Sequence, residues 1–175
     1  IMTRAATVVR RNDQLDTAYA NVDELHRKAM NCSLTDAGSW TNQNVIFTKA
    51  LQDMFPIAKC ILKGARMRDE CRGAHYKPDF ARPSLTETDP VARRKEAEEW
   101  CDEFQKNNDK FLKSSVASYE GDQPTIEYED VDTSSIPPRP RLYGLVGAEV
   151  IDEVWKERCS KKAASESAVP ELSAS

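Results

Sequence analysis

Glycine is scarce in this chain, and its few glycines do not gather into a loop. Six of the 175 residues are glycine, about half of the usual share of roughly 7%. Loops that hold nucleotide phosphates need clustered glycines, because the backbone must approach phosphate closely and adopt positive φ. Only Gly144 and Gly147 lie near each other, and no GxGxxG or Walker motif occurs. The sequence therefore argues against dinucleotide binding by the usual route, and we expect this segment to hold no cofactor.

Glycine and proline are also unevenly distributed along the chain. Residues 1–72 contain three of the fifteen, residues 73–143 contain nine, and the remainder contains three. Because both residues interrupt helices, the first part should be the helical one. We expect a helical bundle over residues 1–76, then a loop, short helix and extended segment packing on the bundle over residues 77–143. A C-terminal extension over residues 144–175 should contain a helix and then a disordered tail.

Apolar residues recur at helical spacing in the first segment. One stripe predicts a helix over residues 13–32, and a second predicts a longer helix that begins after Thr41 or Asn42. A short helix over residues 3–11 completes an antiparallel bundle of about three helices with matching stripes. The first stripe is Leu15, Ala18, Val22, Leu25, Ala29 and Cys32, and the second is Phe47, Leu51, Met54, Ala58, Ile61 and Ala65.

Beyond the bundle, single elements alternate with proline-rich chain. Asp89 and Pro90 are typical of a helix start, and they predict a helix over residues 91–106. Alternation over residues 125–131 predicts one strand. Residues 136–140 contain three prolines and should be extended.

The C-terminal extension has one amphipathic face and a polar end. Ile151, Val154 and Trp155 share a face of a helix that starts near residue 148, and residues 160–175 have the composition of a disordered tail. The expected fold class is mainly α: an antiparallel helical bundle, followed by an extended, proline-rich tail with a short strand and a further helix.

Charge and cysteine content limit the possible partners and ligands. The net charge is −4 and the isoelectric point is about 5.3, so nucleic acid is not an expected partner. The basic helix face formed by Lys59, Lys63 and Arg66 should therefore be solvated or face another subunit. The sequence contains no run of about 20 apolar residues, the length needed to span a membrane, so we expect no direct membrane insertion. The five cysteines are widely spaced, which favours free thiols in a reducing cytosol. They also lack the spacing of metal ligands, so we expect no metal site.

The residues with chemical potential gather at the end of the second long helix. Arg68 and Arg72 suit the negative end of the helix dipole, and Gly73 suits a left-handed stop. His75 follows, either as a general base or as a neutral strut that holds hydrogen bonds. No nucleophile or carboxylate stands beside His75, which favours the strut. Cys71 should be inert, because the C-terminal end of a helix opposes the thiolate.

These residues also carry a family resemblance. The run Gly64-Ala65-x-x-Arg68-x-Glu70-Cys71-Arg72-Gly73-Ala74-His75-Tyr76, followed by Asp79-Phe80, resembles an "ESRGAH" helix end. Three later pieces resemble "W-x-K-x-T", "LEYRPV" and "PPxxRxY" segments, and they stand at residues 110–113, 127–131 and 136–143. Together the four landmarks are similar to the C-terminal helical domain of the flavoprotein subunit of succinate dehydrogenase and fumarate reductase. L-aspartate oxidase shares the first landmark more loosely.

The resemblance implies a supporting part of an oxidoreductase. In that family the FAD-binding domain, the flavin-linked histidine and the residues that bind succinate lie upstream, so no catalytic, cofactor-binding or metal-binding residue is assigned here. The implied partners are the protein's own FAD-binding domain and an iron-sulfur subunit, at the inner face of the cytoplasmic membrane. The structural or interface candidates are Arg68, Glu70, Arg72, Gly73 and His75. Cys71 departs from the usual serine, and the extension after Tyr143 lies beyond the family's usual end.

Two other hypotheses remain open at this point. The chain could be a free-standing helical adaptor that binds a protein through its basic face or through the helix that carries Trp155. L-aspartate oxidase is disfavoured by the long segment that ends in PPRPRLY. The chain starts at Ile1 rather than at methionine, and we expect it to be a piece of a longer protein.

Overall fold

The computed structural model describes residues 1–121 and 123–167, which form two compact units. Unit 1 comprises Ile1–Ala81 and Lys113–Val131, and unit 2 comprises Arg82–Leu112 and the residues from Asp132 onward. Neither unit is one continuous stretch, whereas composition divides the chain into consecutive segments. The mainly α class is confirmed: five α-helices, one 3-10 helix and a two-stranded sheet make up the regular structure of the described residues.

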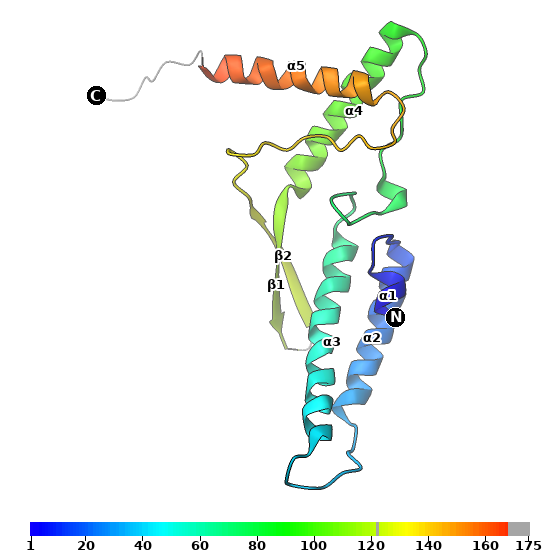
Figure 1. Ribbon diagram of the computed structural model, residues 1–175, viewed down its shortest axis with the longest axis vertical. Coiled ribbons are helices and arrows are strands. Elements are labelled where there is room, and N and C mark those ends of the chain that lie inside the picture. Colours follow the sequence, from blue (N-terminus) through cyan, green and yellow to red (C-terminus); the bar gives the residue numbers. More distant parts are fainter. Residues whose placement is uncertain (122, 168–175) are drawn as a thin grey trace, which may run out of the picture. The chain divides into compact units, whose positions relative to one another are not determined.

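Unit 1 is built on two long antiparallel helices, α2 (Asn12–Met30) and α3 (Gln43–Met67), shown side by side in Figure 1. The side chain of Asn42 caps α3 by accepting hydrogen bonds from the amides of Asn44 and Val45, as the sequence predicts. The third helix expected in the bundle is reduced to the single turn of α1 (Met2–Ala5). The buried apolar core of this unit consists of Ala5, Leu15, Ala18, Val22, Leu62 and Ala65.

The apolar stripe predicted for α3 faces the bundle only through its alanines, Ala58 and Ala65, and the expectation was wrong for its larger members. Phe47 is 66% exposed, Met54 63% and Ile61 45%, while Leu62 and Ala65 are buried. The reason is that α3 carries apolar residues on most of its circumference. The spacing of these residues identifies an apolar stripe, but it does not show which stripe α2 covers.

A β-hairpin completes unit 1. Strand β1 (Lys113–Glu120) pairs antiparallel with β2 (Gln123–Asp130), with Val116 opposite Glu127, and β2 packs against α3. The sequence predicted β2 but missed β1. The sequence KSSVASYE of β1 is mostly polar and small, so β1 becomes recognisable as a strand only through its pairing with β2.

Unit 2 is held together by α4 (Pro90–Phe111) and α5 (Ala148–Ser167). Asp89 caps α4 as predicted, with its carboxylate accepting from the amides of Val91 and Ala92 at 3.1 and 3.0 Å. Gly147 precedes α5 at φ +86°, where a Cβ atom would approach the Leu85 side chain to 2.6 Å. The buried core consists of Leu85, Ala97, Trp100, Cys101, Phe104, Ile151, Val154 and Trp155.

Both helices of unit 2 run further than the sequence predicts. Helix α4 ends at Phe111 rather than near residue 106, because its last turns bury Asn108 and Phe111. Helix α5 continues to Ser167, so the tail expected to be disordered from residue 160 is helical over residues 160–167. Its run of Lys, Ala and Glu favours helix. Residues 168–175 lie outside the described residues.

Candidate functional site

The candidate residues 68–75 form a tight turn after α3 rather than its last turn. Helix α3 ends at Met67 with Arg68 as its C-cap, so the expected stop at Gly73 was wrong. Gly73 instead has φ +59° between Arg72 and His75, whose backbones exchange hydrogen bonds of 2.9 and 3.0 Å. Positive φ explains the glycine, because other residues adopt it at a cost. Glu70, three residues beyond the end of α3, is buried inside this turn.

Glu70 lies at the centre of the turn and is 1% exposed. Its carboxylate accepts from the Arg68 guanidinium at 2.6 Å and from Nε of Arg72 at 3.1 Å. A second Arg72 nitrogen lies 2.9 Å from the other carboxylate oxygen, so the Arg72 contact is bidentate. A buried carboxylate requires such compensation, because burial without a partner strongly disfavours the charge. The structure thus brings Arg68, Glu70 and Arg72 into one ion-paired cluster.

Arg68 also joins the turn to the hairpin. Its second terminal nitrogen donates to the backbone oxygen of Lys113 at 2.8 Å and to the Ser115 hydroxyl at 3.1 Å. Its guanidinium carbon lies 5.4 Å from the centre of the Tyr128 ring, within the range of cation–π attraction. One arginine therefore connects the end of α3 with both strands.

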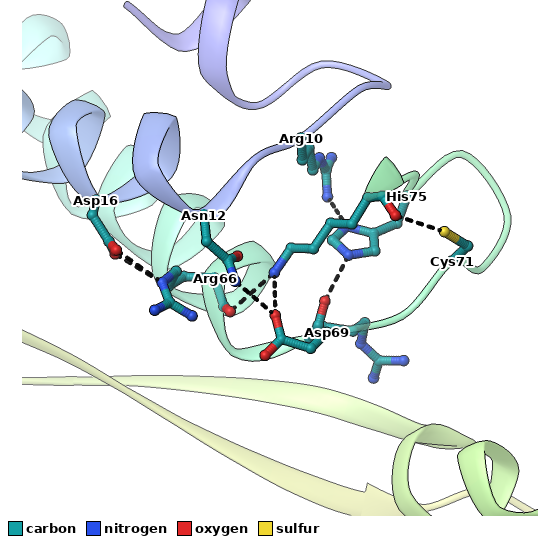
Figure 2. Close-up of polar contacts among 9 residues, drawn as sticks. Arg10, Asn12, Asp16, Arg66, Asp69, Cys71 and His75 are labelled. Atoms are coloured by element: carbon teal, nitrogen blue, oxygen red, sulfur yellow. Dashed lines mark hydrogen bonds and ion pairs between the residues drawn. The ribbon is translucent and has the colours of Figure 1, made fainter. Parts of the chain in front are cut away.

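His75 uses both ring nitrogens within unit 1, as Figure 2 shows. Its Nδ1 lies 2.6 Å from an Arg10 guanidinium nitrogen, and its Nε2 lies 2.8 Å from the Arg68 carbonyl oxygen. Because arginine can only donate, Nδ1 accepts and Nε2 carries the proton. Burial lowers the pKa of His75, and the nearby charges of Arg10 and Lys77 lower it further. The histidine is therefore neutral and held on both sides, which is the geometry that a strut requires.

A second cluster, centred on Asp69 and Lys77, was missed by the sequence analysis. Lys77 is 1% exposed, and its ammonium donates to Asp69 at 2.8 Å and to the Arg66 carbonyl oxygen at 3.1 Å. Asn12 donates to the same Asp69 oxygen at 3.1 Å. Burial raises the pKa of Asp69, but the hydrogen bonds from Lys77 and Asn12 outweigh this effect and the pKa lies below its usual value. Asn12 lies 57 residues from Asp69, and Lys77 reaches Asp69 only through the turn between them, so no helical or strand periodicity could have identified the cluster.

The N-terminal segment is bound to the same turn. The Arg10 amide donates to the Tyr76 carbonyl oxygen at 2.8 Å, and the Tyr76 amide donates to the Val8 carbonyl oxygen at 3.1 Å. The Arg10 side chain also donates to the Thr7 and Ala6 carbonyl oxygens. The thiol of Cys71 is directed at the Lys77 carbonyl oxygen at 3.2 Å. All these contacts are hydrogen bonds that hold backbone in place, and none presents a reactive group.

The basic face of α3 makes its contacts inside unit 1, so the expectation that it is solvated or subunit-facing was wrong for Lys59, whereas the Arg66 side chain is 42% exposed. Lys59 is 1% exposed and lies 2.5 Å from the Asp23 carboxylate. Lys63 donates to the Pro124 carbonyl oxygen, and Arg66 pairs with Asp16 at 2.9 Å. The ends of these cations are directed at acceptors on α2 and β2.

Two further kinds of feature are absent from the part of the chain that the structure describes. Within residues 1–121 and 123–167, no three His, Cys, Asp or Glu side chains come together as a metal ion would require. None of the helices in the same part of the chain has the length and apolar character needed to cross a membrane.

Comparison with known proteins gives consistent matches over most of the chain. Residues 1–143 match the family described as "Fumarate reductase flavoprotein C-term". A succinate dehydrogenase flavoprotein subunit of Bacillus subtilis is 34% identical over 144 residues, which cover 81% of this chain and 21% of that protein. A fumarate reductase flavoprotein subunit of Serratia is 27% identical, with 82% and 20% covered. Among solved structures, an E. coli quinol fumarate reductase superposes with a TM-score of 0.60 at 26% identity, covering 82% of this chain and 21% of that one. The chain thus spans about a fifth of the length of these relatives.

Proposed function

The chain belongs to the fumarate reductase flavoprotein C-terminal family, and on this premise we propose that it supports FAD-dependent interconversion of succinate and fumarate. In the whole protein it would be the C-terminal helical domain of a succinate dehydrogenase or fumarate reductase flavoprotein subunit. Electrons would pass from the flavin to an iron-sulfur subunit. The observation that carries this proposal is the match over residues 1–143, together with coverage of about a fifth of each relative.

The domain contributes structure rather than catalytic groups. Both ring nitrogens of His75 are hydrogen-bonded, and Glu70 is paired with two arginines. A general base needs a free lone pair within reach of substrate, and a neutral His75 that accepts from Arg10 does not offer one. The candidate residues Arg68, Glu70, Arg72, Gly73 and His75 therefore hold α3, the hairpin and the N-terminal segment together.

Two helix N-termini of this segment, those of α3 and α4, are not open to a phosphate group of FAD. Phosphate binding needs open amides at a helix N-terminus, but the Asn42 and Asp89 side chains already accept from the first amides of α3 and α4. At the glycine pair, the space beside Gly147 is taken up by the Leu85 side chain. FAD would be bound by the upstream part of the protein, and we assign no step of the reaction to residues of this chain.

The expected partners follow from the same proposal. They are the protein's own FAD-binding domain and an iron-sulfur subunit, and the complex would lie at the inner face of the cytoplasmic membrane. The Bacillus relative is named as the flavoprotein subunit of succinate dehydrogenase, which supports assembly with other subunits. The surfaces considered for a free-standing adaptor are engaged elsewhere, since Lys59 pairs with Asp23 and Trp155 is 7% exposed.

The proposal is tested with the full-length protein that contains this segment. We expect it to carry flavin and to reduce an electron-accepting dye with succinate, whereas residues 1–175 alone should be colourless and inactive. In the full-length protein, Arg72→Ala should lower thermal stability or subunit assembly more than turnover per flavin. Arg27→Ala, at an arginine whose side chain is 72% exposed, is the control and should change neither. A yellow, active fragment would contradict the proposal, and so would a stable Arg72→Ala protein whose turnover per flavin collapses.

A further inference from the structure

A cavity opens in unit 1 where α2, α3 and the first residue of β2 meet. Its volume is about 350 Å³, and the buried side chains of Leu15 and Leu62 form its base. Tyr19, Lys63 and Arg66 also line it. Cavities that hold small organic molecules span roughly 300–1,000 Å³ and combine apolar walls with a few polar groups. The size and the mixed lining of this cavity therefore fit a small organic ligand.

The cavity carries an excess of positive charge. Among the described residues that line it, the cations Lys63 and Arg66 accompany one carboxylate, that of Asp16. The chain as a whole has a net charge of −4, so the local balance is opposite in sign to that of the molecule. An anionic ligand is therefore favoured here over a neutral or cationic one.

Arg66 directs two donors away from its own ion pair. Its Nε donates to both carboxylate oxygens of Asp16, at 2.9 and 3.0 Å. Neither of its terminal nitrogens has a hydrogen-bond partner among the described residues, and Figure 2 shows both pointing away from Asp16. The two terminal nitrogens of a guanidinium can bind a carboxylate in a bidentate manner. Lys63, one turn earlier on α3, donates to the Pro124 carbonyl oxygen, which occupies one of its three N–H groups.

We propose that this cavity binds a small organic carboxylate with a compact apolar or aromatic body. The carboxylate pairs with the terminal nitrogens of Arg66 and with the ammonium of Lys63. The apolar body lies over Leu15 and Leu62, beside the ring of Tyr19. A phosphate is a poorer match, because a dianion meets a balance of only one positive charge and leaves the apolar base of the cavity uncovered.

Fluorine NMR of the full-length, flavin-containing protein tests the proposal, with para-(trifluoromethyl)benzoate as the probe. Succinate is present in excess, so that the substrate site expected in the rest of the protein is already filled. We expect saturable binding with a dissociation constant in the millimolar range or below. Arg66→Gln should raise this constant at least about 10-fold, because hydrogen bonds to a charged group are lost. Lys63→Met should weaken binding in the same direction, and it is the second variant in case Arg66→Gln does not fold.

Arg27→Gln is the matched control, since it makes the same substitution in unit 1 at a side chain that is 72% exposed. Arg27 lies about 12 Å further along α2 than Tyr19, beyond the Debye length of about 8 Å at physiological salt. The dissociation constant should therefore change by less than about twofold.

The neutral analogue para-(trifluoromethyl)benzamide shows whether the charge is recognised, and we expect it to bind at least about 10-fold more weakly. Equal binding of the amide would reveal an apolar pocket without anion recognition and overturn the proposal. Binding of the benzoate that neither Arg66→Gln nor Lys63→Met weakens would place the probe elsewhere in the protein, with the same consequence. Absence of binding would also overturn it, and the flavin content and succinate oxidation of the same sample would still report separately on the proposed function.

Discussion

Replacing Trp155 by alanine should open the core of unit 2. Trp155 is 7% exposed, and its ring meets the ring of Phe104 edge to face, with centroids 5.0 Å apart. Truncating a buried tryptophan costs about 3–5 kcal/mol, because transfer free energy is lost and a cavity remains. We take the lower part of this range, about 3 kcal/mol, since Trp155 retains slight exposure and its indole nitrogen has no hydrogen-bond partner among the described residues.

The assay is hydrogen exchange of the α4 amides in the full-length protein. Amides of α4 exchange when the helix opens locally. If the free energy of this opening falls by about 3 kcal/mol, exchange becomes roughly 10²-fold faster. The peptide that covers residues 97–104 is the reporter, because Ala97, Trp100, Cys101 and Phe104 line the core. Glu153→Ala is the matched control, since Glu153 lies in the same helix and is exposed. Its exchange should change by less than about threefold.

An unchanged α4 peptide in Trp155→Ala would refute this reasoning. It would mean that α5 does not contribute to the stability of α4, and that the contacts of Ile151, Val154 and Trp155 do not hold in the whole protein. The point matters because α5 lies beyond the family-matched residues 1–143. If the prediction is met, the extension after Tyr143 is an integral part of unit 2.

Two further predictions concern the turn after α3. Glu70→Ala leaves two guanidinium groups without their shared carboxylate, so thermal unfolding should show a loss of about 3 kcal/mol, whereas Glu127→Ala at an exposed strand position should lose less than about 0.5 kcal/mol. The pKa of His75 is lowered in the folded protein, so below about pH 6.5 the unfolded chain binds a proton that the folded chain does not. The free energy of unfolding should therefore decrease as the pH is lowered below about 6.5, by at most about 1.4 kcal/mol per pH unit. His75→Asn should remove that slope between pH 6.5 and 5.5, and an unchanged slope would contradict the neutral strut.

Local signals predicted those parts of the fold that depend on neighbouring residues. The cap at Asp89 and the strand at residues 125–131 follow from side chains that act within a few positions, and both are present. The motif around Arg68 and His75 was recognised from its residues alone. Its internal geometry was not predictable, because Glu70 meets Arg68 and Arg72 only after the helix has ended early.

Long-range partners account for what the sequence analysis missed. Arg10 lies 65 residues from His75, and the Lys63 contact with Pro124 spans 61 residues. Strand β1 has little apolar character of its own and exists through its pairing with β2. No periodicity within one segment contains information on such pairs.

By itself, the sequence determined the class of the molecule and the kind of protein it belongs to. The two long apolar stripes specify helices, and the scarce, scattered glycines exclude a glycine-rich phosphate-binding loop. Both signals are local, because they depend on side-chain spacing and on backbone freedom within a segment. Only the tertiary structure decided which face of α3 is buried, why Lys59 and Lys77 are inside, and what α5 covers. Burial of a side chain depends on what packs against it, and the partner of Lys59, Asp23, lies on another helix, while Lys77 reaches Asp69 only because the chain turns back after α3.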